Sequence, residues 1–196
     1  MKRKRIFIFP VVFVILSFMT AAPLCGPQEE EVLVEELEVP ATASLQEEYH
    51  IGTTCNDPSA AGPDMESSPL LEGVEYHITA TGTATTLGDA QTDPDGVIQS
   101  GAFCNYSEGE AMPADDYDCT CSDGIPVQDG AAAGSLIAVF LDIHKRPFGD
   151  PFVVGSDLRL TVPEGAAILA LAVNDDDFTD NSGSYQVSIF EIRQPE

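Results

Sequence analysis

Hydrophobic and polar positions alternate strictly along several short segments of this chain. Residues 74–81, 158–162 and 185–189 each place apolar side chains at every second position, with polar ones between them. A period of two is typical of a strand with one buried face and one solvated face. The pattern therefore predicts three half-buried strands.

Two further segments are apolar almost throughout. Residues 135–143 and 166–173 are rich in Ala, Val, Ile and Leu, as expected of strands buried on both faces. Residues 152–155 predict another short strand, and no segment shows a helical period with caps. Many short strands separated by turn residues predict an all-β sandwich or barrel with antiparallel sheets.

An acidic loop lies between the last two predicted strands. Residues 175–180 carry four aspartates, and Asn181 follows them. Two charges about 4 Å apart repel by roughly 4 kcal/mol at the dielectric near a protein surface. Ca²⁺ offsets such repulsion, since it takes about six to eight oxygen ligands. We expect side-chain oxygens from Asp175, Asp180 and Asn181 and carbonyls from residues 177–179; a solvated turn is the alternative.

Residues 1–25 have the order of a secretory signal peptide. A basic cluster at 2–5 precedes an apolar run at 6–19, and small residues follow. The run is shorter than the roughly 20 residues of a usual spanning helix, although a membrane anchor is the alternative. Cys25 stands where a bacterial lipoprotein carries its lipid, but Leu24 departs from the small residue expected there. We expect a secreted or cell-envelope protein, in the periplasm or on the outer surface.

The rest of the chain divides into a linker and a domain. Residues 26–49 are rich in Glu and predict an acidic linker, because acid-rich segments stay extended and solvated. Residues 50–196 are predicted to form the folded domain. A hydrophobic content of 43% is enough for a core.

The charge balance limits the partners. The chain has 8 Lys and Arg against 33 Asp and Glu, and four of the cations lie in residues 2–5. Phosphate binding needs a basic face, so nucleic acid is excluded and an anionic membrane surface is disfavoured. We expect membrane contact only through the signal segment or a lipid on Cys25.

Four cysteines follow Cys25 in an exported chain, and an oxidising compartment favours disulfides. They are Cys55, Cys104, Cys119 and Cys121. Cys119 and Cys121 are too close for comfortable mutual pairing, so we expect Cys55 and Cys104 to pair with one each. Sequence does not choose between the two arrangements, and zinc binding is a weaker alternative.

Catalysis is not expected. His50, His77 and His144 lie far apart, and the alternation places His77 on a solvated strand face. Carboxylates are too numerous for one acid–base pair to stand out. No phosphate loop, nucleophile elbow or zinc helix motif is present in the sequence.

Residues 134–192 resemble the calcium-dependent galactose-binding lectins of the LecA (PA-I) type and the wider LecA-like family. The matching segments are Gly134–Ala138, Pro151–Gly155, Leu158–Gly165, Leu169–Asp175 and Asp180–Tyr185. The most specific part is Asn-Asp followed by Asp-Asn-Ser-Gly-Ser. Upstream, Ala80–Gly82 and Asp93–Gly96 also match, so the resemblance covers residues 72–192 and is weakest over 100–130.

The resemblance implies a small jelly-roll β-sandwich with one Ca²⁺ at its edge. Carried over by position, the ligands are Asp175, a carbonyl near Asp177, Asp180, Asn181 and a carbonyl at Thr86. The loop from Asp175 to Asp180 is shorter than in the galactose lectin. Asp180 replaces the lectin's Asn, which adds charge in favour of the cation.

In such lectins the calcium binds two vicinal sugar hydroxyls directly. Residues 112–121 would supply the remaining sugar contacts, but they lack the lectin's His and Gln and offer Asp115, Asp116 and Tyr117 instead. Galactose specificity therefore does not carry over, and neither the sugar nor the oligomeric state is predicted. We expect carbohydrate binding; the alternative is a non-catalytic, calcium-stabilised structural or adhesion domain making protein–protein contacts.

Overall fold

The computed structural model describes residues 29–45, 62–103, 105–113, 131–175, 178 and 181–194. Within those ranges the chain forms strands and turns, with no helix long and apolar enough to cross a membrane. The strands are β1 (Glu30–Pro40), β2 (Ala43–Ser44), β3 (Gly62–Pro63), β4 (Met65–Glu66), β5 (Glu75–Leu87), β6 (Ala90–Thr92), β7 (Ile98–Ser100), β8 (Ala102–Phe103), β9 (Tyr106–Ser107), β10 (Leu136–Leu141), β11 (Pro147–Val153), β12 (Asp157–Thr161), β13 (Ile168–Val173) and β14 (Ser182–Arg193).

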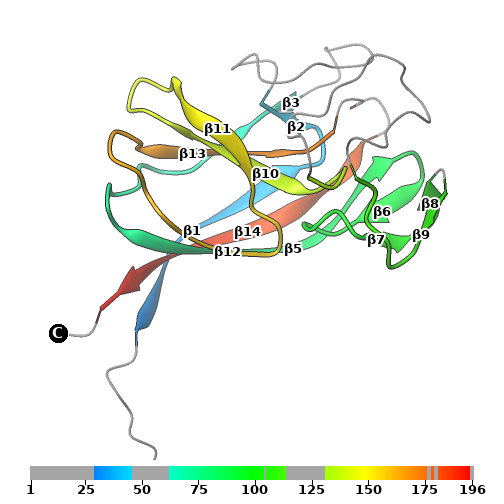
Figure 1. Cartoon of the computed structure of the whole chain (residues 1–196), viewed down its shortest axis with the longest axis horizontal. Helices are drawn as coiled ribbons and strands as arrows, with labels where there is room; N and C mark the ends of the chain where they lie inside the picture. Colours follow the sequence, from blue (N-terminus) through cyan, green and yellow to red (C-terminus); the bar gives the residue numbers. More distant parts are fainter. Residues whose placement is uncertain are drawn as a thin grey trace, which may run out of the picture.

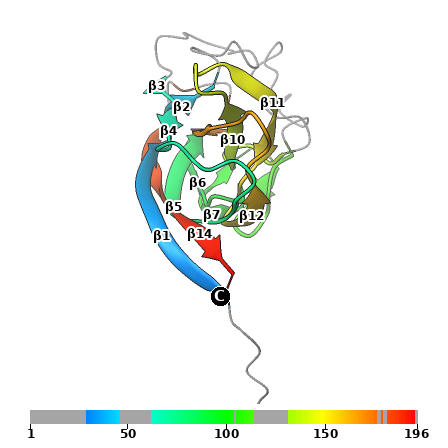
Figure 2. The same ribbon diagram turned by 90° about the vertical axis from the view of Figure 1, so that its left-hand side faces the viewer.

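The strands form two main antiparallel sheets that stack face to face (Figures 1 and 2). One sheet has the order β1-β14-β5-β6-β7, with β12 also pairing with β5, and the other has the order β11-β10-β13-β4. Two small pairs, β2–β3 and β8–β9, lie outside them, and β2–β3 is parallel. The predicted all-β sandwich is confirmed.

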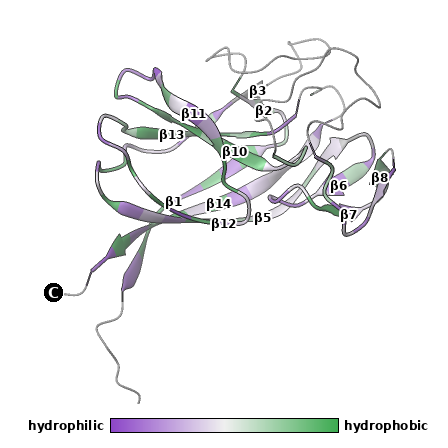
Figure 3. Ribbon diagram, in the orientation of Figure 1, coloured by the Kyte–Doolittle hydropathy of each residue, from purple (hydrophilic) through white to green (hydrophobic). Residues whose placement is uncertain are grey.

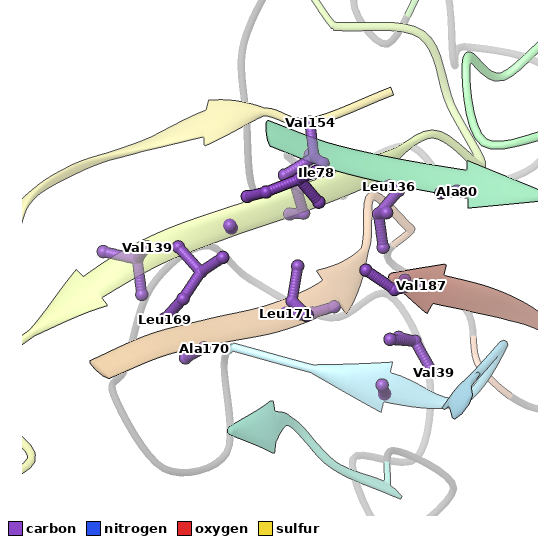
Figure 4. Close-up of a cluster of buried hydrophobic side chains, with 14 of the residues drawn as sticks. Val39, Ile78, Ala80, Leu136, Val139, Val154, Leu169, Ala170, Leu171 and Val187 are labelled. Atoms are coloured by element: carbon purple, nitrogen blue, oxygen red, sulfur yellow. The ribbon is translucent and has the colours of Figure 1, made fainter. Parts of the chain in front are cut away.

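The core lies between the two sheets. All six residues of β10 and all six of β13 are buried, and Figure 3 colours β13 as strongly hydrophobic. Figure 4 shows Leu136 and Leu171 from these strands among side chains of the other sheet, including Ile78 and Val187. The two apolar runs are thus central strands, as the sequence predicts.

The half-buried strands are also confirmed. In β5, Tyr76, Ile78 and Ala80 are buried while their neighbours are more exposed. In β14, Tyr185 and Val187 are buried on either side of the exposed Gln186. β5 extends to Leu87, beyond the predicted end at residue 81.

The prediction of an acidic linker is wrong for residues 30–44. These residues form β1 and β2, and β1 pairs along its whole length with β14. Val39 is fully buried and Leu37 packs against the core. Four of the five Glu residues of β1 are exposed and Glu35 is half-buried, so an acid-rich composition concealed an edge strand whose last residues turn apolar side chains inward.

Ion pairs fix the start of β1 to the rest of its sheet. Arg159 on β12 donates to Glu29 and to Glu31, each at 2.9 Å. His77 on β5 lies 3.0 Å from Glu31 and 3.3 Å from Asp157, and its side chain is only 14% exposed. His77 therefore points outward as predicted, but it is covered by charged neighbours rather than solvated.

β1 and β14 connect the two ends of the sandwich. At one end Glu30 pairs with Arg193, where the described chain begins and finishes. At the other end the Ala41 amide donates to the Gly183 carbonyl at 3.0 Å, beside the connection between β13 and β14. A strand of this length spans roughly 35 Å, so the acidic connection lies far from the Glu30–Arg193 pair.

Candidate metal centre

The predicted calcium loop crosses from one sheet to the other. β13 ends at Val173 in the four-stranded sheet, and β14 begins at Ser182 in the six-stranded sheet. Asn174, Asp175, Phe178 and Asn181 are described in this connection, whereas the predicted ligands Asp177 and Asp180 lie outside the described residues. Phe178 is 4% exposed, so the connection carries an apolar side chain inward.

Asp175 is buried where the chain leaves β13. Its residue exposure is 1%, and that of Asn174 is 0%. Asn174 is held by its side-chain amide, which donates to the Ala132 carbonyl at 3.1 Å, and by its carbonyl, which accepts from the Gly134 amide at 2.8 Å. These bonds fix the backbone immediately before Asp175.

Asn181 presents a buried oxygen on the other side of the connection. Its Nδ2 donates to the Ala41 carbonyl at 2.8 Å, which fixes the orientation of the amide group. Its Oδ1 is buried and has no hydrogen-bond donor among the described residues. A buried acceptor left without a donor costs about 1–3 kcal/mol. A cation at this oxygen would remove that cost.

Thr86 reaches the same end of the sandwich from β5. The β5–β14 register ends with Thr85 opposite Ser182, which sets Thr86 next to Asn181. The β5–β6 register shifts between Thr85 and Leu87, and such bulges reorient the backbone near functional sites. A Cβ atom at Gly134 would collide with the Thr86 hydroxyl, so Thr86 lies against the loop that binds Asn174. The register and these bonds place Thr86, Asp175 and Asn181 at the same end of the sandwich.

The Tyr185 hydroxyl lies at the centre of a buried polar cluster beside these residues. It is 2.6 Å from the Gly134 carbonyl, 3.0 Å from the Asp93 carbonyl and 3.0 Å from Thr92 Oγ1. Thr92 Oγ1 is in turn 3.0 Å from Thr86 Oγ1. The sequence pattern did not identify Tyr185 or Thr92 as site residues. The available signal was a tyrosine at an inward strand position, since a buried phenol needs a partner for its O–H.

The electrostatic environment at this end is negative. Burial is the main cause that raises the pKa of Tyr185, and a hydrogen bond with Thr92 opposes it. The carboxylates of Asp93, Asp175 and Asp95 raise the pKa of Tyr185 further, because nearby negative charge disfavours the phenolate.

The basic side chains after residue 28 form ion pairs in other parts of the molecule. These pairs are Lys145 with Glu66, Arg146 with Asp142, Arg159 with Glu29 and Glu31, and Arg193 with Glu191. Among the described residues, no Lys or Arg forms an ion pair at the acidic end.

The donor atoms at this end suit a hard cation. A carboxylate, an amide oxygen and backbone carbonyls are the oxygen ligands that Ca²⁺ takes. The described residues alone do not gather three or more His, Cys, Asp or Glu side chains that could hold a metal. A calcium site here would therefore combine Asp175 with neutral oxygens from Asn181 and Thr86, and would draw further ligands from the rest of the connection.

The other predicted site residues lie outside the described residues. These are the sugar-contact candidates Asp115, Asp116 and Tyr117 and the disulfide candidates Cys55, Cys104, Cys119 and Cys121. Cys25 also lies outside them. Their roles stay predictions.

A hollow of about 540 Å³ is present at the opposite end of the sandwich. Its lining includes Glu75, Glu191 and Arg193 from β5 and β14. Arg193 Nε donates to Glu191 at 2.7 Å, and this contact raises the pKa of Arg193. None of the predicted site residues lines the hollow.

No family model matches the sequence, and no curated protein matches it. Among solved structures, one similar chain is described as "EclA N-terminal domain; PllA-like lectin". It shares 20% sequence identity and a TM-score of 0.43, and the match covers 81% of this chain and 97% of that one.

Proposed function

We propose that this protein binds Ca²⁺ between the two sheets and uses the bound ion to hold carbohydrate. The observation that carries the calcium part is the buried Oδ1 of Asn181, which has no donor among the described residues and lies at the acidic end with Asp175 and Thr86. These oxygens would coordinate Ca²⁺, and the ion would neutralise part of the local negative charge. Asp177 and Asp180 are the proposed additional ligands.

Carbohydrate binding follows from the coordination number of the ion. Ca²⁺ takes about six to eight oxygens, and water or another ligand fills the positions that the protein leaves open. Two neighbouring sugar hydroxyls would complete the shell without adding charge to an already acidic surface. The site also lies at the end of the sandwich opposite to the Glu30–Arg193 pair. Asp115, Asp116 and Tyr117 are the proposed additional sugar contacts.

A second candidate function is a calcium-stabilised structural or adhesion domain. It is favoured by the bonds that tie separate segments together at this end. Asn181 donates to Ala41, and Gly134 donates to Asn174. An ion here would stiffen several loops at once, as a protein-binding surface requires. Under either function we propose an exported, non-catalytic protein, with the four cysteines after Cys25 in disulfides.

Thermal unfolding and calorimetric titration test the metal. Ca²⁺ should raise the melting temperature of the intact chain, because a ligand of the native state stabilises it. Asn181→Ala and Asp175→Asn should each lose most of this increase. The matched control is Gln186→Ala, which removes an exposed amide from β14, the strand that follows Asn181, and should leave the increase intact. An unchanged melting temperature with Ca²⁺, and no heat of binding, would overturn the calcium site.

A glycan array separates the two functions. The intact protein is applied with Ca²⁺, with a chelator, and as Asn181→Ala. Binding that requires both the ion and Asn181 supports the lectin function. Calcium-dependent stabilisation without any calcium-dependent glycan binding would leave the structural function alone.

A further inference from the structure

The ligands of the proposed site come from two different sheets. Thr86 and Asn181 lie at the ends of β5 and β14 in the six-stranded sheet, whereas Asp175 follows β13 in the four-stranded sheet. Ca²⁺ holds its oxygens at about 2.3–2.6 Å. A small sliding of one sheet over the other would therefore separate the ligands. The geometry needs a rigid connection between the sheets at this end.

Tyr185 makes that connection. It belongs to β14, and its hydroxyl is 2.6 Å from the carbonyl of Gly134, just before β10 of the opposite sheet. The Gly134 amide donates to the Asn174 carbonyl at 2.8 Å, one residue before Asp175. Two hydrogen bonds thus join a residue of one sheet to the backbone that carries the buried carboxylate.

Two threonines extend the connection to the other ligands. A phenol has one proton, and the shortest contact assigns it to the Gly134 carbonyl, so the Tyr185 oxygen accepts from Thr92 Oγ1 at 3.0 Å. Thr92 then accepts from Thr86 Oγ1 at 3.0 Å. The resulting directional chain runs from Thr86 through Thr92 and Tyr185 to Gly134. Thr86, Thr92 and Tyr185 are at most 1% exposed, so water does not compete for these bonds.

We propose that Tyr185 is a positioning residue for the calcium site, acting with Thr92 to hold Thr86 and Asp175 at a fixed separation. The proposal rests on the proposed calcium binding but adds residues that do not touch the ion. The Tyr185 hydroxyl is engaged by Gly134 and Thr92, so its role is to orient the loops rather than to ligate the ion.

The test compares two tyrosines that lose the same atom. Tyr185→Phe removes the hydroxyl and keeps the ring. Tyr76→Phe is the matched control, because Tyr76 is 2% exposed and its hydroxyl accepts from the Leu71 amide at 3.0 Å, toward the opposite end of β5. Calcium affinity is measured by calorimetric titration, and the melting temperature is measured without calcium. Both variants should melt somewhat lower, but only Tyr185→Phe should weaken calcium binding, by about tenfold.

Thr92 provides a rescue and a coupling test. Thr92→Val keeps the shape and removes the hydroxyl, so it should weaken calcium binding about as much as Tyr185→Phe. Thr92→Ser keeps the hydroxyl and should restore most of the affinity. Since both side chains act in one chain of bonds, the double variant Thr92→Val with Tyr185→Phe should bind little worse than either single variant.

The outcomes separate this proposal from the calcium proposal. If the unmodified protein takes up no Ca²⁺, calcium binding itself fails and the positioning role fails with it. If the unmodified protein binds Ca²⁺ and Tyr185→Phe binds equally well, only the positioning role is overturned. Equal weakening by Tyr185→Phe and Tyr76→Phe would also overturn it, because the effect would then be general destabilisation.

Discussion

Asp95 holds Ser156 with both of its carboxylate oxygens. Oδ1 accepts from the Ser156 amide at 2.8 Å, and Oδ2 accepts from the Ser156 hydroxyl at 2.6 Å, although 61 positions separate the two residues. The pair joins the turn between β6 and β7 to the turn between β11 and β12. Gly155 has a φ of 63° and no room for a Cβ beside Asp95, so the second turn is shaped to receive the carboxylate.

Asp95→Ala should lower stability by about 1–2 kcal/mol, because two hydrogen bonds to an ionised acceptor are lost at an exposed position. Denaturant unfolding measures the change. Removing any aspartate also relieves repulsion in a chain with formal net charge −25. Asp89→Ala, at an exposed turn position, is therefore the charge control and should be neutral or slightly stabilising. An equal effect of the two substitutions would contradict a specific role for the Asp95–Ser156 pair.

Gly134→Ala should destabilise the protein more than an ordinary glycine substitution. Gly134 has a φ of 77°, and a Cβ there would meet the hydroxyls of Thr86 and Thr92. Gly109 has a similar φ of 88° with nothing within 4 Å of the added Cβ. Gly109→Ala thus measures the backbone strain alone, about 1 kcal/mol. We expect Gly134→Ala to cost at least about 2 kcal/mol more than this in chemical denaturation, and to abolish calcium binding. Similar costs at the two glycines would show that the Thr86–Thr92 contact is loose.

The strands that the sequence predicted correctly share one property. Either apolar and polar residues alternate without interruption, as in residues 74–81, or nearly all residues are apolar, as in residues 166–173. In β1 the signal was hidden, because Val32, Leu33 and Val34 are consecutive and only Leu37 and Val39 keep the alternation. The register of β1 with β14 shifts between Leu33 and Glu35, and a bulge of this kind breaks a period-two pattern.

For the candidate site, sequence could name side chains but not the contacts between distant segments. Asp175 and Asn181 could be predicted because they lie in one acidic loop whose spacing resembles that of the family. Tyr185 and Thr92 were not, because their roles come from a contact 93 positions apart in the chain. Short strands such as β6 have too few residues to show a hydrophobic period. Their neighbouring strands are therefore known only from the strand pairing in the structure.

Asp142 should make the β10–β11 hairpin sensitive to acid. Its hydrogen bonds with Arg146 lower the pKa of Asp142 to about 2 from an ordinary value of 3.8. A lowered pKa means that the folded state favours the ionised form. The stabilisation is therefore complete above about pH 4 and is lost as the pH falls toward 2.

Asp142→Asn should consequently melt below the unmodified protein at pH 6, and the difference should shrink toward zero near pH 2. Melting curves across this range measure it. Asp89→Asn removes a charge from an exposed turn without this contact, so it should not melt below the unmodified protein at pH 6. A constant difference between pH 6 and pH 2 would mean that the Arg146 contact does not favour the ionised carboxyl.

β1 should contribute to the stability of the core, as a solvated linker would not. Val39 is 0% exposed and packs between the sheets near Leu171 and Val187 (Figure 4). Val39→Ala should lower the free energy of unfolding by about 2 kcal/mol, because it removes two buried methyl groups and leaves a cavity.

Val34→Ala on the same strand is the matched control. Val34 is 45% exposed, so its loss should change stability by no more than about 0.5 kcal/mol. Denaturant unfolding of both variants decides between the two descriptions of residues 30–40. An edge strand fixed to β14 requires a large difference between the two valines, whereas a solvated linker would give two small and equal effects.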